Sequence, residues 1–151
     1  GSKQKTSTRI AAFFVQFVRH LSVTTAEAVG GEMVIYKTGV KCLYFRLLTT
    51  PIVGIAIDIQ QKDPEIRALL YDQFLELRRL LEAEWGDDIF YESSHFLESG
   101  VEVSRIFIKL ENAYFYDKEQ WTEISSWYEK HLLSLDAFWD TVGDIVKALA
   151  R

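Results

Sequence analysis

The run IVGIAIDI, residues 52–59, constrains the fold of this chain more than any other segment. A short, almost continuous apolar run is typical of a β-strand that is buried on both of its faces. We therefore expect this strand to lie in the middle of a sheet. Asp58 is the only acidic residue in the run, so it is the first residue to consider for a function.

Hydrophobic periodicity predicts the elements on either side of this strand. Apolar residues at steps of three and four predict a helix that ends at about residue 21. A helix should begin at Asp63-Pro64, since Asp is a good N-cap and Pro suits the first turn, and it should extend toward Trp85. A last helical region of about thirty residues should follow Asp117, with Gln120 completing a capping box. Strands are expected at about 33–36, 40–48, 89–96 and 101–110.

The predicted order of elements is α-β-β-β-α-β-β-α(α), where Ser134 or Asp136 could start a second segment of the last helix. Tight turns join the first three strands, and Gly39 can supply a positive φ angle in the first turn. These features predict an α+β fold: a five-stranded, mainly antiparallel sheet with helices packed mainly on one face. The 151 residues suit a single domain, residues 1–151, in which residues 1–2 resemble a cloning scar.

Composition narrows the class of function. A net charge of −5 argues against non-specific binding to nucleic acid or to acidic membranes. No apolar run is long enough to span a bilayer, and the single cysteine, Cys42, favours a reducing, cytoplasmic location. The three histidines lack metal-ligand spacing, and no glycine-rich phosphate loop is present. We therefore expect no cofactor and no metal, and we assign no catalytic residue.

Four segments carry a resemblance to a known family: YKTGVKCLYFR, IAIDIQQKDPEIRALLYDQFLELRRLLE, VSRIF and SLDAFW. Together they resemble the bacterial domain of unknown function 4268, over nearly the whole chain. The resemblance implies no activity, although some members are attached to nuclease-like domains. Many relatives have Glu-x-x-His at the end of the third strand, where this chain has Asp58-Ile59-Gln60-Gln61. A site that needs that imidazole would be incomplete here.

One hypothesis is a divergent or degenerate domain resembling restriction endonucleases, acting on nucleic acid. Such enzymes need acidic residues on neighbouring strands to hold Mg²⁺, and a lysine that assists the attacking water. Asp58 could be one of these acids, but position 60 is Gln and the nearest lysine is Lys62. The alternative is that Asp58 is a strand-end carboxylate, either solvated or paired with Arg46 or Arg105.

A second hypothesis is a polar cluster on one face of the sheet. Tyr44 and Arg46 share a face, as do Arg105 and Lys109, because alternate residues of a strand point the same way. If these faces coincide, they could line a groove that binds an anion, a peptide or a nucleic-acid backbone. An exposed sheet face without function is the alternative. The candidate binding residues are Lys37, Tyr44, Arg46, Asp58, Glu92 and Arg105.

A third hypothesis is a partner-binding domain with exposed aromatic residues in the last helical region. The residues in question are Trp121, Trp127, Tyr128, Phe138 and Trp139. The alternative is that most of these rings fill the core. On balance the sequence favours a non-catalytic interaction or accessory domain, with a homodimer or another protein as the partner, nucleic acid as a less favoured ligand, and no membrane. The nuclease-like domain is the second choice.

Overall fold

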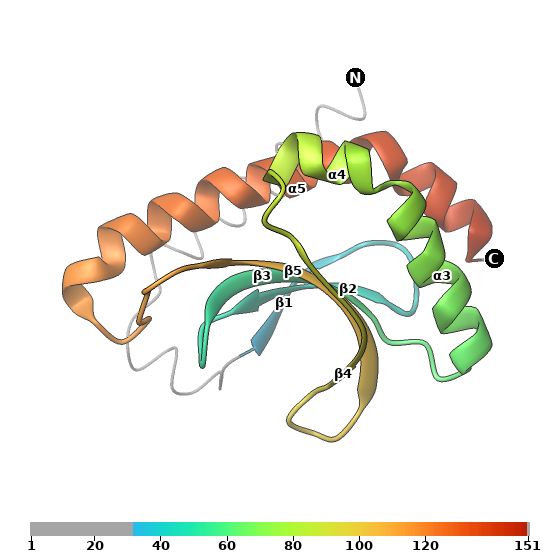
Figure 1. Ribbon diagram of the computed structural model, residues 1–151, viewed down its shortest axis with the longest axis horizontal. Coiled ribbons are helices and arrows are strands. Elements are labelled where there is room, and N and C mark those ends of the chain that lie inside the picture. Colours follow the sequence, from blue (N-terminus) through green and yellow to red (C-terminus); the bar gives the residue numbers. More distant parts are fainter. Residues whose placement is uncertain (1–31, 151) are drawn as a thin grey trace.

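The computed structural model describes residues 32–150 and shows an antiparallel sheet covered by helices (Figure 1). Within these residues the sheet has five strands, in the order β1-β2-β3-β5-β4. Every pair of neighbouring strands is antiparallel. The strands are β1 (Glu32–Lys37), β2 (Leu43–Leu48), β3 (Val53–Ile59), β4 (Phe90–Phe96) and β5 (Glu102–Leu110).

The apolar run forms β3, which lies in the middle of the sheet and is buried along its whole length. Alternate residues of β3 point to opposite faces. Val53, Ile55, Ile57 and Ile59 belong to the main hydrophobic core, so we call their side the helix face. Gly54, Ala56 and Asp58 point to the other side, which we call the polar face. Both faces of this strand are thus covered, as an uninterrupted apolar run predicts.

The helix predicted from Asp63 to Trp85 is two helices, α3 (Pro64–Glu76) and α4 (Arg78–Trp85). The start is as expected, because the Asp63 carboxylate accepts a hydrogen bond from the Glu65 N–H at 2.9 Å. The predicted continuity is wrong. At Leu77 the backbone leaves helical geometry, with φ −90° and ψ 6°, and the chain bends there (Figure 1). The bend lets Phe74 before it and Leu81 after it both reach the core.

The last helix, α5 (Trp121–Leu149), is one element of 29 residues. The suggested second segment at Ser134 or Asp136 is wrong, because the apolar stripe continues through both positions and Ser134 Oγ donates to the Lys130 carbonyl within the helix. A 3₁₀ turn, η1 (Lys118–Gln120), precedes α5. Asp117 caps this turn by accepting from the Glu119 N–H, but the Gln120 side chain accepts from the Tyr114 N–H instead of completing a capping box.

The three described helices lie on the same side of the sheet (Figure 1) and cover its helix face with aromatic side chains. Phe45 of β2 meets Trp139 of α5 edge to face, with 5.4 Å between ring centroids. The hydroxyl of Tyr128 donates to the Leu48 carbonyl at 2.5 Å. The proposed aromatic contact surface on the last helix is therefore wrong for Tyr128, Phe138 and Trp139, which are buried. Trp121 and Trp127 are half-buried.

The predicted α+β class with an antiparallel sheet is confirmed. The first predicted helix falls among residues 1–31, outside the described residues, so the complete order of elements stays a prediction. Among the described helices, none combines the length and the apolar character that crossing a bilayer requires.

The half-buried imidazole of His131 on α5 makes stability depend on pH. The indole Nε1–H of Trp85 donates to the His131 carbonyl, and His131 Nδ1 lies 2.9 Å from the Trp127 carbonyl. Burial lowers the pKa of His131 from its ordinary value of 6.5; the nearby Lys130 acts in the same direction, and the Trp127 hydrogen bond opposes them. The folded protein therefore keeps this imidazole neutral at a pH where the unfolded chain is already protonated.

We expect the midpoint of thermal unfolding to fall as the pH drops through about 6.5, because the unfolded state then binds the extra proton. The contribution of His131 is fully present above that pH and is lost as the pH approaches its folded pKa. Scans of the wild type and of His131→Gln between about pH 7.5 and pH 5.5 measure it. The variant should show the smaller decrease, and identical decreases in both proteins would assign the effect to other groups.

Candidate functional site

Five of the six candidate binding residues lie in one row across the sheet. The strand register pairs Lys37 with Tyr44, Tyr44 with Asp58, Asp58 with Arg105, and Arg105 with Glu92. Directly opposed residues in antiparallel strands share a face, so this polar row runs along the polar face from β1 to β4. The sixth residue, Arg46, follows Tyr44 by two positions on β2 and therefore shares the same face.

Asp58 is the centre of the row, and two guanidinium groups bind its carboxylate. Arg105 makes a bidentate pair, with Nε 2.8 Å from Oδ1 and Nη2 2.7 Å from Oδ2. Arg46 Nη1 lies 2.7 Å from Oδ2. All three side chains are buried, with Asp58 at 0% exposure. The pairing that the sequence offered as an alternative for Asp58 is therefore present with both arginines, and it joins β2, β3 and β5.

Arg46 has two further contacts on the polar face. Its Nη2 donates to the Gln60 side-chain carbonyl at 2.8 Å, and its guanidinium carbon lies 4.9 Å from the centre of the Tyr44 ring. A cation above an aromatic face is attracted by the electrons of the ring. Gln60 was not among the candidate residues. The signal that could have found it is its position two residues after Asp58, on the same face of the strand.

The two ends of the row contribute less to the cluster. Glu92 lies opposite Arg105 in the register, but its Oε1 is 3.0 Å from Nδ1 of His95, a residue that the site prediction missed. A bulge in β4 brings Glu92 and His95 together, and no local pattern in the sequence indicates that bulge. Lys37 is placed by its register alone, since its side chain lies outside what the structure describes. Ligand binding by the six residues stays a prediction.

The charges of the cluster decide which chemistry suits it. Both Asp58 oxygens accept from arginine, so a metal ion there would have to displace a charge-assisted hydrogen bond and approach two positive groups. Within residues 32–150, no group of three His, Cys, Asp or Glu side chains is arranged to hold a metal ion. The buried contacts instead suit a structural ion cluster. Removing any one of its charged side chains would strongly destabilise the fold.

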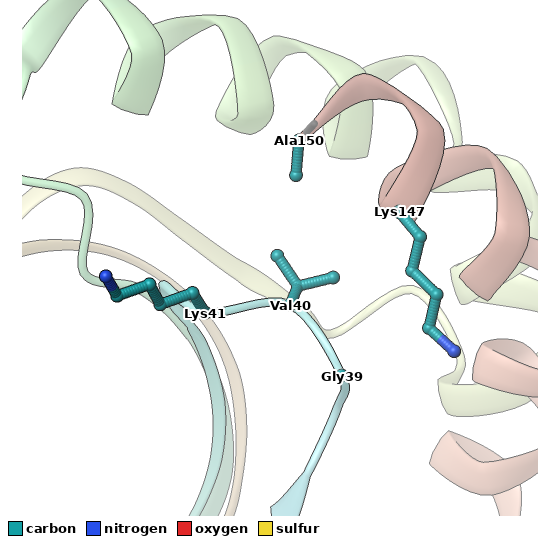
Figure 2. A pocket seen from close by; sticks show the side chains of 5 residues that line it. All are labelled: Gly39, Val40, Lys41, Lys147 and Ala150. Carbon is teal, nitrogen blue, oxygen red and sulfur yellow. The ribbon is translucent and has the colours of Figure 1, made fainter.

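The β1–β2 turn is a second candidate place for a binding site, because lysine side chains lie beside it. A small cavity of about 210 Å³ beside it is lined by Gly39, Val40, Lys41, Lys147 and Ala150. Figure 2 shows the side chains of Lys41 and Lys147 on opposite sides of the cavity, with their amino groups pointing away from each other. The two lysines therefore do not converge on one ligand.

Local hydrogen bonds explain the shape of this turn. Thr38 Oγ1 donates to the Leu43 carbonyl at 2.9 Å and accepts from the Val40 N–H at 3.1 Å. Gly39 has the predicted positive φ, at 86°, where a side chain would be strained. The turn is therefore stabilised by the hydrogen bonds of Thr38 and by the backbone conformation of Gly39.

The comparisons with known proteins identify the family of this chain. No curated protein and no solved structure is significantly similar to the chain. One family model, described as a domain of unknown function (DUF4268), matches residues 11–142. The match covers most of the chain and agrees with the resemblance of the four sequence segments. The chain therefore belongs to the DUF4268 family.

Proposed function

We propose that this protein is a non-catalytic interaction domain that binds another protein chain, copies of itself included, in the bacterial cytoplasm. The observation that carries the proposal is the exposed border of the sheet at β4. Three large apolar side chains are exposed here: Phe90 at 41% and Phe96 at 63%, at the two ends of β4, and Val101 at 40%, in the turn that joins β4 to β5. We call these three residues the β4 rim. Phe90 lies on the polar face opposite Phe107, and Phe96 lies on the helix face opposite Glu102, so the rim follows the edge of the sheet and not one of its faces. Exposed apolar side chains along one edge are a feature of contact surfaces.

The polar row supports the same proposal because its central carboxylate, that of Asp58, is not available to a metal ion. A nuclease-like domain needs a carboxylate that is available to Mg²⁺, whereas both oxygens of Asp58 already accept from arginine. In our proposal Asp58, Arg46 and Arg105 hold three strands in register beneath the contact surface. The sheet then acts as a rigid support for the β4 rim.

Two measurements test the proposed function. Affinity capture with the wild type and with Phe90→Ser/Phe96→Ser should show a specific protein that the double variant loses. Tyr114→Ser is the matched control, because Tyr114 is also an exposed ring, at 59%, but lies outside the β4 rim. The control should retain the captured protein.

The second measurement addresses catalysis. Single- and double-stranded DNA and RNA are incubated with the wild type and with Asp58→Asn in the presence of Mg²⁺. We expect no cleavage by either protein. Magnesium-dependent cleavage by the wild type that disappears in Asp58→Asn, while circular dichroism shows that the variant is still folded, would overturn the proposal and establish the nuclease-like alternative.

A further inference from the structure

We propose that the outer edge of β4 pairs with β4 of a second copy of this chain, around a two-fold axis between Ser93 and Ser94. This inference rests on the proposed interaction function and names the partner. β4 is an end strand of the sheet, and among residues 32–150 it pairs only with β5. Its outer backbone groups can therefore accept another strand, as exposed sheet edges commonly do.

The bulge in β4 determines which kind of strand can pair with its outer edge. Glu92 lies opposite Arg105 and His95 lies opposite Val103, so three steps along β4 match two steps along β5. Ser104 Oγ holds this segment by donating to the Ser93 carbonyl at 2.7 Å. A bulge interrupts the regular spacing of an edge, and it normally protects that edge against pairing with an ordinary extended strand. A second copy is different, because it carries the same bulge.

The faces of the residues are consistent with such a pair. In a regular strand, residues three apart point to opposite faces. A two-fold axis perpendicular to the sheet keeps each side chain on its own face. In two regular identical strands, Glu92 could therefore never lie opposite the second copy's His95. The bulge places both side chains on the polar face, where they contact each other at 3.0 Å. The register that opposes Glu92 to the second copy's His95 is therefore available because of the bulge.

The sequence of β4, FYESSHF, is complementary to itself in this register. Each Glu92 carboxylate faces an imidazole that can donate an N–H, and each Tyr91 faces the exposed ring of Phe96 on the helix face. Ser93 faces Ser94 at the centre. Opposed charged and aromatic pairs of this kind each add about 0.2–1 kcal/mol to strand pairing. Because one pair of seven-residue strands buries little surface, the dimer should be weak, with a Kd on the order of micromolar.

Two charge variants and their mixture test the pairing. Glu92→Lys places a positive charge opposite His95 of the second copy, and His95→Glu places a negative charge opposite Glu92. Each variant alone should dimerise at least about tenfold more weakly than the wild type, a change of about 1.4 kcal/mol. In an equimolar mixture, the introduced lysine of one variant faces the introduced glutamate of the other, and the native His95–Glu92 pair is retained. The mixture should therefore associate more strongly than either variant alone.

Sedimentation velocity over about 1–300 µM measures the association, and circular dichroism confirms that both variants fold. Both side chains are partly exposed, at 43% for Glu92 and 29% for His95, so the folds should persist. A monomeric wild type throughout this range, variants that dimerise like the wild type, or a mixture no stronger than its components would each overturn the pairing. None of these results bears on the cleavage and capture experiments, which test the interaction function separately.

Discussion

Replacing Asp58 with alanine should lower the free energy of unfolding by about 3–5 kcal/mol. The carboxylate is fully buried and accepts hydrogen bonds from both Arg46 and Arg105. Removing it leaves two positive side chains close together in a buried site, where their hydration cannot be restored without opening the sheet. Equilibrium unfolding in urea, followed by circular dichroism, measures the loss.

Two further variants separate charge from packing at this position. Asp58→Asn keeps the shape but presents an amide in place of a negative charge, so it should remain strongly destabilised if the charge is what matters. Asp144→Ala removes an exposed acidic side chain on α5 and should change stability by no more than about 0.5 kcal/mol. If Asp58→Ala unfolds at the same urea concentration as the wild type, the ion cluster does not stabilise the sheet.

Replacing Phe45 with alanine should cost about 3–5 kcal/mol, because the change opens a cavity between the sheet and α5. Phe45 is 2% exposed and meets Trp139 edge to face. This contact joins β2 to the middle of the longest helix, so the loss should appear as a lower urea midpoint with a largely unchanged slope. Urea unfolding measures both quantities.

The controls for Phe45 test the cavity explanation. Phe45→Leu refills most of the space and should cost clearly less than alanine does. Tyr114→Ala removes a ring that is 59% exposed and should change stability by about 0.5 kcal/mol or less. Equal losses for alanine and leucine at position 45 would show that the aromatic contact, and not the filled volume, carries the stabilisation.

The candidate site was partly predictable from the sequence. Asp58 drew attention because a single acid interrupts an apolar strand, and period-two alternation placed Arg46 on the same face as Tyr44. Whether Arg46 and Arg105 reach Asp58 depends on the register between strands that lie far apart in the chain. A shift of one residue would send either arginine to the opposite face, so the bidentate pair could be offered only as one of two alternatives.

Two local irregularities could not be predicted at all. The break at Leu77 interrupts a continuous apolar stripe. It lets the side chains of α3 and α4 both pack against the core beneath them. The bulge between Glu92 and His95 is stabilised by Ser104, a residue of the neighbouring strand. Neither feature has a glycine or a proline to indicate it, because the cause lies in another part of the molecule.

The amino-acid sequence by itself determined the apolar strand at 52–59, the striped helices that cover it and hence the α+β class. These features depend on period and composition, which act over a few neighbouring residues. Only the tertiary structure decided that two arginines bind the Asp58 carboxylate and that Glu92 contacts His95 at the bulge in β4. Those contacts depend on strand register and on packing between distant segments, which local periodicity does not encode.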